Sequence, residues 1–309
     1  MSKNKQVSHS IMLAMAAFIW GIAFVAQSTG GDALGPYAFN GIRNLIATLV
    51  VLFIVFVRDR IGIGIKPLDM SEKKTLWKTG VLCGTALFIA STLQQVGINM
   101  GTPVGKAGFL TATYILIIPI VGIFMKKPCG WNAFLGAVLM LVGIYLLCIK
   151  EKFSIGFTDG LILLCALCFT VQIMLIDTLV KDQDPVRVAC IQFFTTGVLS
   201  IPFAIAFDMN GFTGIAKWSS CLASKEAWIS LLFAAVFSSG VAYTFQMVGQ
   251  QGVNPTLASM LMSMESMFSV LAGWVLLGEV LTVKELIGCG IMFIAIILAQ
   301  LPLAKGKNE

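Results

Sequence analysis

Long apolar stretches alternate with short polar breaks along the whole chain. A membrane-spanning helix needs roughly 20 apolar residues, with a range of about 17 to 25. Ten segments meet this requirement, with approximate bounds of 9–28, 36–57, 77–98, 104–125, 131–149, 158–180, 186–207, 227–249, 255–277 and 283–303. The pattern predicts an all-α polytopic membrane protein with ten transmembrane helices.

The breaks carry residues typical of turns and helix ends, such as Gly35-Pro36, Asp184-Pro185 and Asn254-Pro255. Thr282-x-x-Glu285 predicts a capping box at the start of the last helix. The first apolar run is longer than the core of a signal peptide, so we expect it to be retained as a membrane helix.

An internal repeat covers much of the chain. Residues 90–146 align with residues 242–298 without a gap, and the register pairs Gln94 with Gln246, Gly97 with Gly249, and Pro103 with Pro255. Paired Gln, Gly and Pro are less easily explained by chance than paired apolar residues. We therefore expect two five-helix repeats, at 1–149 and 150–309, with the binding site between them.

The distribution of basic residues predicts the orientation. With the N-terminus in the cytoplasm, fourteen Lys and Arg residues lie on the cytoplasmic side, six lie on the outer side, and Arg43 lies inside a span. Cytoplasmic loops are the more basic ones, so both termini are expected to be cytoplasmic. Because five spans is an odd number, the two repeats should have opposite orientations, which suits alternating access.

Composition supports the membrane assignment and argues against other classes. The chain of 309 residues is 58% hydrophobic and only 12% charged, with a mean hydropathy of +0.91. A soluble domain carries roughly twice that charged fraction. The net charge of +6 comes from short loops at the membrane edges, so we expect a lipid bilayer around the protein and no nucleic-acid partner.

Cysteine and histidine do not indicate a metal site or a cofactor. Most of the eight cysteines lie in apolar runs, and Cys165-x-x-Cys168 falls in mid-helix, where packing is favoured over a redox or metal role. His9 is the single histidine. We expect no metal and no cofactor.

Glu265 is the strongest candidate for a functional residue. It lies near the middle of the ninth predicted span, about 15 Å from either end, where a charge costs about 2.5–3.5 kcal/mol. Burial disfavours the charged form, so Glu265 could exchange protons near neutral pH or bind an amine. The alternative is a structural acid that is hydrogen-bonded to Gln or Tyr. Thr113 occupies the equivalent position in the first repeat.

Other polar residues inside spans are candidates for lining a substrate cavity. Arg43 lies about 10 Å inside the second span and could snorkel outward, form an ion pair or bind an anion. Polar stripes in both repeats favour a solute path over helix packing. The expected cavity residues are Trp20, Gln27, Asn40, Arg43, Gln94, Tyr114, Tyr243 and Gln246. Lys106 is a candidate rim charge, or alternatively a snorkelling lysine.

Three stretches of the sequence resemble a known family. The segments FIWGIAFVAQ (Phe18–Gln27) and GPYAFNGIRNLIATLVVL (Gly35–Leu52), with Trp20-Gly21 and Arg43, look like the opening of EamA-type proteins of the drug/metabolite transporter superfamily. LLGEVLTVKELIG (Leu276–Gly288) resembles the signature of the second repeat of that family. The resemblance implies ten helices and transport of small organic solutes, often by export from the bacterial cytoplasm.

Together these features predict a secondary transporter of the bacterial cytoplasmic (inner) membrane. We expect it to export a small organic metabolite or drug by proton-coupled antiport, with Glu265 carrying the proton. An uncoupled facilitator or exchanger would need the same cavity. A membrane-embedded enzyme would need an edge cluster, and the only acidic one, around Asp177, Asp182 and Asp184, contains no histidine. A monomer and a homodimer are both compatible with the sequence.

Overall fold

The computed structural model describes residues 3–63, 65, 69–126, 129–149, 155–268, 270–271 and 282–300. Over these residues the secondary structure is helical and contains no strand. The predicted all-α class is therefore confirmed.

The chain forms long helices with short, tighter or wider helical turns between some of them. The N-terminal half contains α1 (Lys3–Leu34), α2 (Pro36–Arg60), α3 (Met70–Asn99), α4 (Val104–Ala112), α5 (Tyr114–Phe124) and α6 (Trp131–Cys148). The C-terminal half contains α7 (Phe157–Leu179), α8 (Pro185–Phe203), the π-helix η1 (Ala204–Asp208), the 3-10 helix η2 (Phe212–Gly214), α9 (Ile215–Trp218), the 3-10 helix η3 (Ser219–Ala223), α10 (Lys225–Phe233), the π-helix η4 (Ala234–Tyr243), α11 (Thr244–Gln250), α12 (Pro255–Met262) and α14 (Val283–Gln300).

Eight helical stretches within the described residues are long and apolar enough to cross a membrane. They coincide with the first eight predicted spans. The ninth predicted span, 255–277, begins as α12 and continues partly outside the described residues, whereas the tenth, 283–303, coincides with α14 as far as residue 300. A multi-pass membrane protein is thus confirmed, and the count of ten remains a prediction.

Helix starts follow the local signals in the sequence. Pro36, Pro185 and Pro255 open α2, α8 and α12, where a missing backbone N–H leaves no helical bond unmade. The predicted capping box is confirmed: the backbone N–H of Thr282 donates to Glu285 Oε2 at 2.8 Å, and the backbone N–H of Glu285 donates to Thr282 Oγ1 at 3.2 Å. These signals fix where the spans begin.

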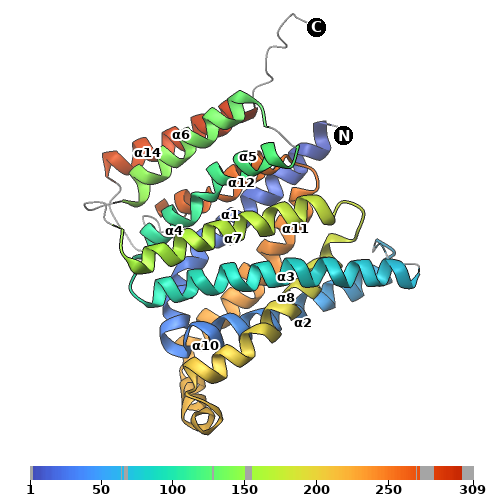
Figure 1. Ribbon diagram of the computed structural model, residues 1–309, viewed down its shortest axis with the longest axis vertical. Helices are drawn as coiled ribbons and strands as arrows, with labels where there is room; N and C mark the ends of the chain where they lie inside the picture. Colours follow the sequence, from blue (N-terminus) through green and yellow to red (C-terminus); the bar gives the residue numbers. More distant parts are fainter. Residues whose placement is uncertain are drawn as a thin grey trace, which may run out of the picture.

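The helices form a bundle with a tight pair at each edge (Figure 1). α6 and α14 lie side by side at one edge, α2 and α8 pack together at the opposite edge, and α1, α3, α4, α5, α7, α11 and α12 fill the middle. The middle helices contribute most of the buried apolar residues. The centre of the bundle is therefore enclosed by helices from both halves of the chain.

Glycines allow the close approach of α6 and α14. A Cβ atom on Gly288 would lie 2.7 Å from the carbonyl oxygen of Gly143, and one on Gly143 would lie 2.9 Å from the carbonyl oxygen of Gly288. Such reciprocal contacts between backbones require small residues, which is how helices commonly pack in membranes.

Charged side chains fasten α2 to α8 at both ends. Arg58 Nη1 lies 2.9 Å from Asp184 Oδ1, and Arg187 Nη2 lies 2.5 Å from Asp59 Oδ1. At the other end, Asp208 in η1 accepts a 2.6 Å hydrogen bond from a backbone N–H in the first turn of α2. Because the helices are tied at both ends, they form one antiparallel unit.

We expect Gly288→Val to destabilise the protein by about 1–3 kcal/mol, since the added side chain has no room against the α6 backbone. The melting temperature of the purified protein in detergent measures this loss. Gly290→Val in the same helix is the matched control, because a Cβ at Gly290 meets nothing within 4 Å. Equal melting temperatures for the two variants would contradict the proposed packing.

Candidate functional site

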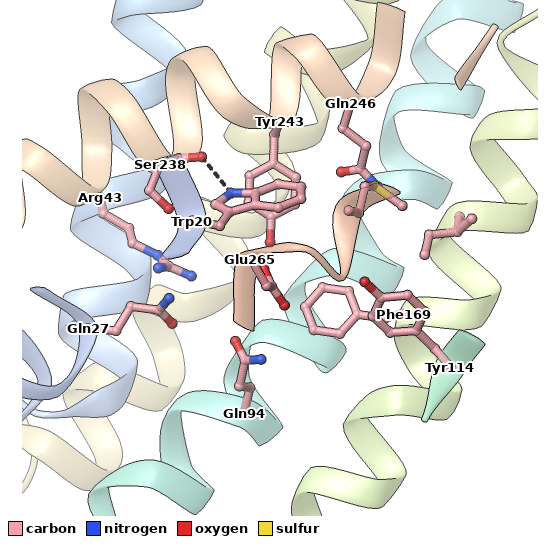
Figure 2. Close-up of a pocket in the computed structure, with 12 residues that line it drawn as sticks. Trp20, Gln27, Arg43, Gln94, Tyr114, Phe169, Ser238, Tyr243, Gln246 and Glu265 are labelled. Carbon is pink, nitrogen blue, oxygen red and sulfur yellow. Dashed lines mark hydrogen bonds between the residues drawn. The ribbon is translucent and has the colours of Figure 1, made fainter. Parts of the chain in front are cut away.

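A polar cavity lies in the middle of the bundle, surrounded by apolar helices (Figure 2). Its free volume is about 50 Å³, room for water molecules and not for a large solute. It is lined by Trp20, Gln27, Arg43, Gln94, Tyr114, Phe169, Ile173, Ser238, Tyr243, Gln246, Met262 and Glu265. The lining residues come from both halves of the chain, as expected for a site between the two repeats.

Two of the predicted spans are broken where they reach this cavity. The fourth span divides at Thr113 into α4 and α5, and the ninth turns at Ser263 and Met264 before the helix resumes at Glu265. The fourth predicted span is thus confirmed as a span that contains a turn, and the part of the ninth span that the structure describes also contains one. At the breaks, backbone N–H groups donate three residues back, as from Thr113 to Leu110, so the turns tighten.

The two breaks contact each other directly. Ser263 Oγ and Tyr114 Oη form a 2.9 Å hydrogen bond, and both residues are buried. Ser263 caps the end of α12 and Tyr114 begins α5. This bond joins the start of α5 to the end of α12 at the wall of the cavity.

Glu265 occupies the first helical position after the second break and lines the cavity. It is only 7% exposed, and no described residue forms a hydrogen bond or an ion pair with its carboxyl group. The predicted alternative of an acid held by Gln or Tyr is therefore not what the structure describes. A carboxyl group in this position is tolerated when it is protonated, solvated by water in the cavity, or paired with a positive group that enters the cavity.

Arg43 also reaches the cavity and does not snorkel, because it is 3% exposed. Its Nε donates a 3.2 Å hydrogen bond to Asn40 Oδ1, and its guanidinium carbon lies 5.6 Å from the centre of the Phe39 ring. Within the described residues it forms no ion pair. Its described contacts are with Asn40 and Phe39 on its own helix, and the binding of an anion stays a prediction.

Asn40 does not line the cavity, contrary to our expectation. It is fully buried between α2 and α3, where its Nδ2 donates to Ser91 Oγ at 3.0 Å and to Thr92 Oγ1 at 3.1 Å. Asn40 lies one helical turn before Arg43, so we expected both side chains to face the cavity. The hydroxyl groups of Ser91 and Thr92 on α3 instead hold the Asn40 amide away from the cavity. Asn40 thus accepts a hydrogen bond from Arg43 without lining the cavity itself.

Aromatic side chains form one wall of the cavity. The rings of Trp20 and Tyr243 meet edge to face with centroids 4.8 Å apart, and Trp20 Nε1 donates to the backbone oxygen of Ser238 at 3.1 Å. Ser238 and Tyr243 belong to the π-helix η4. π-Helical turns are often found at functional sites. Hydropathy alone did not predict a π-helix in this segment.

The paired glutamines of the repeat both face the cavity. Gln94 Nε2 donates to Thr111 Oγ1 at 3.0 Å, and Gln246 Nε2 donates to Gln172 Oε1 at 3.3 Å. Gln246 Oε1 is buried with no hydrogen-bond partner among the described residues. Gln27 lines the same space, and its backbone oxygen accepts a bond from the side chain of Gln95. The cavity therefore offers amide groups beside its two ionisable ones.

Lys106 is not at the rim of the cavity. Its Nζ lies 2.6 Å from Asp159 Oδ2, and this pair joins the start of α4 to the start of α7. The two side chains are 18% and 5% exposed. The predicted rim position is therefore wrong, because Lys106 does not line the cavity and its partner lies on a distant segment of the chain. Snorkelling toward the membrane edge stays a prediction.

Four residues that line the cavity were not predicted from the sequence: Phe169, Ile173, Ser238 and Met262. Phe169 and Ile173 lie one turn apart on α7, among many similar apolar residues. Met262 lies one turn before Glu265, which is the only local signal for its position.

The acidic residues considered for an enzyme have structural contacts. Asp184 caps α8 through the backbone N–H of Val186 at 2.9 Å and pairs with Arg58. Among the described residues, no three His, Cys, Asp or Glu side chains are grouped to hold a metal ion. Asp184 therefore holds α8 against α2. It belongs to no metal-binding group among the described residues.

Comparison with known proteins places these features in a family. The family model of EamA-like transporters matches residues 8–149 and again residues 156–301. A protein of Archaeoglobus fulgidus described as an uncharacterized transporter is 30% identical over 96% of this chain and 87% of its own length. The uncharacterized transporter YwfM of Bacillus subtilis is 22% identical over 97% of this chain and 96% of its own.

A crystal structure shows the same fold at low sequence identity. It superposes with a TM-score of 0.77 and 16% identity, over 95% of this chain and 96% of that one. A chloroplastic WAT1-related protein of Arabidopsis thaliana is 22% identical over 92% of this chain and 67% of its own.

The pair of Lys106 and Asp159 should stabilise the fold without affecting solute selection. We expect Lys106→Gln to lower stability by about 1–3 kcal/mol, because Asp159 then stays buried without its cation. A double-mutant cycle with Asp159→Asn, followed by thermal melting, measures the coupling. A rim charge would instead lower the flux of acidic solutes and leave the melting temperature unchanged.

Proposed function

The chain belongs to the EamA-like transporter family, and on this premise we propose that it is a secondary transporter of the cytoplasmic membrane. It carries a small organic metabolite or drug by alternating access, and the central cavity is the solute site. Export of the solute is coupled to entry of protons, and Glu265 carries the coupling proton. The protein is thus a carrier and not an enzyme.

The unpartnered carboxyl group of Glu265 is the observation that carries this proposal. A structural acid would be held by fixed donors, whereas Glu265 is buried and lacks a hydrogen-bond partner among the described residues. Its carboxyl group can therefore take up the coupling proton and release it again as the cavity opens to each side.

Two inverted repeats of five spans would supply the moving parts. The family model matches the chain twice, and the offset that takes Ala90 to Ala242 also takes the bounds of α6 onto those of α14. The same offset brings Thr113, at the first helix break, onto Glu265, beside the second. These correspondences support the domains 1–149 and 150–309. The distribution of Lys and Arg along the sequence supports both termini in the cytoplasm.

The small size of the cavity supports alternating access. Sites for organic ligands commonly occupy about 300–1,000 Å³, whereas this cavity has about 50 Å³. A solute therefore requires the surrounding helices to move apart. Half-bundles that rock about a central site would open it to one side at a time.

Proteoliposomes with an internal pH dye test the proposal across a panel of metabolites and drugs. We expect substrate-dependent proton movement with the unmodified protein. In Glu265→Gln, coupled flux should fall to the level of protein-free vesicles, because the amide cannot release a proton.

Glu72→Gln is the matched control, since Glu72 is exposed at the start of α3 and should leave flux unchanged. Solute flux without proton movement, unaffected by Glu265→Gln, would contradict coupling and favour an uncoupled facilitator or exchanger. Chemical conversion of a lipid-linked substrate by the protein would favour an enzyme instead.

A further inference from the structure

We propose that Arg43 determines the specificity of the cavity by binding a carboxylate group of the transported solute. This inference rests on the proposed function, because it takes the central cavity as the solute site. It goes further by naming the chemical class of the solute: a monoanionic organic acid with an apolar or aromatic body.

The guanidinium of Arg43 has unused donors that face the cavity. Only Nε is engaged, by Asn40 Oδ1 at 3.2 Å, while Nη1 and Nη2 meet no hydrogen-bond acceptor among the described residues. The side chain is 3% exposed, so bulk water does not solvate it freely. Figure 2 shows the guanidinium directed into the space that Gln27, Trp20 and Glu265 also line.

Neighbouring side chains fix the direction of these free donors. Both hydroxyl partners of Asn40 Nδ2, Ser91 and Thr92, lie on α3, so the amide must turn its oxygen toward Arg43. Ser91 Oγ in turn donates to the backbone oxygen of Leu87 at 2.7 Å, which leaves its lone pairs for Asn40. Asn40 is therefore a positioning residue for Arg43.

Among the residues that the structure describes, no acidic side chain forms an ion pair with Arg43. Each described ion pair involves another basic residue, Arg58, Lys106 or Arg187. Glu265 lines the same cavity but is not paired with Arg43. Because a buried charge without a counter-ion is unfavourable, an anionic ligand would stabilise this arrangement.

The geometry and the charge of Arg43 select a carboxylate. The terminal N–H groups of a guanidinium form a planar fork that matches two carboxylate oxygens. Arg43 is the only cationic residue that lines the cavity among the described residues. One positive charge balances one carboxylate, whereas a phosphate dianion would leave excess negative charge beside Glu265.

The rest of the lining suits an apolar body. Trp20, Tyr114, Phe169 and Tyr243 contribute aromatic surface around the same space. Aromatic rings stabilise bound solutes through their large apolar area. The solute would therefore hold its carboxylate at Arg43 and its apolar part against these rings.

Equilibrium binding to the purified full-length protein in detergent tests this inference with pairs of acids and their neutral amides. The probes are isovalerate with isovaleramide, benzoate with benzamide, and phenylacetate with phenylacetamide. We expect at least one acid to bind about tenfold or more tightly than its amide. Arg43→Gln should reduce this ratio to about one, and Arg43→Lys should retain part of it.

Arg60→Gln is the matched control, because Arg60 lies on the same helix but is exposed and outside the cavity. Its acid-to-amide ratio should equal that of the unmodified protein. Asn40→Asp should lower the ratio as well, since a second carboxylate beside Nε would compete with the ligand. Thermal melting checks that each variant is folded.

The inference is overturned if no acid binds better than its amide to the unmodified protein, or if the preference survives in folded Arg43→Gln. These results are separable from the fate of the proposed function. Proton-coupled flux of an amine without any preference for acids would leave the transporter proposal intact and refute the role of Arg43. Acid binding through Arg43 without coupled flux would support the role of Arg43 and refute the proposal of proton-coupled transport.

Discussion

Arg43 and Glu265 are both buried at the wall of one cavity, and no described ion pair joins them. Ionisable groups are unfavourable inside a membrane protein unless they are paired, solvated or neutral. Elsewhere the chain follows this rule closely, since Arg58, Lys106 and Arg187 all have carboxylate partners. Among the described residues, Arg43 and Glu265 have no such partner, which is why we propose the cavity between them as the solute site.

The strongest helix contacts and the irregular backbone occupy different parts of the bundle. At one edge α6 and α14 pack through reciprocal glycines, and at the other edge charged residues hold α2 against α8. The broken spans and the π-helix η4 lie around the cavity. Backbone that departs from regular helix inside a membrane is tolerated where it lines a cavity, so these irregular turns and the buried ionisable groups have a common location.

Hydropathy predicted the first eight spans because membrane insertion depends on the same apolar length that it measures. The internal repeat identified Gln94 and Gln246, and both line the cavity. The helix breaks were missed because Thr113 and Ser263 sit in apolar runs, with no Gly or Pro at the break itself. The places of Asn40 and Lys106 were wrong because Ser91 and Asp159, which hold them, lie on distant segments whose proximity only the fold creates.

We propose that this cavity opens alternately to the two sides of the membrane. Labelling of Ser238→Cys, in a background without the eight native cysteines, tests it with a membrane-impermeant maleimide applied from each side in vesicles. Ser238 lines the cavity but bears no ionisable group. The account predicts labelling from both sides, with the balance shifted by a transported solute. Labelling from one side only, under every solute and pH condition, would contradict it.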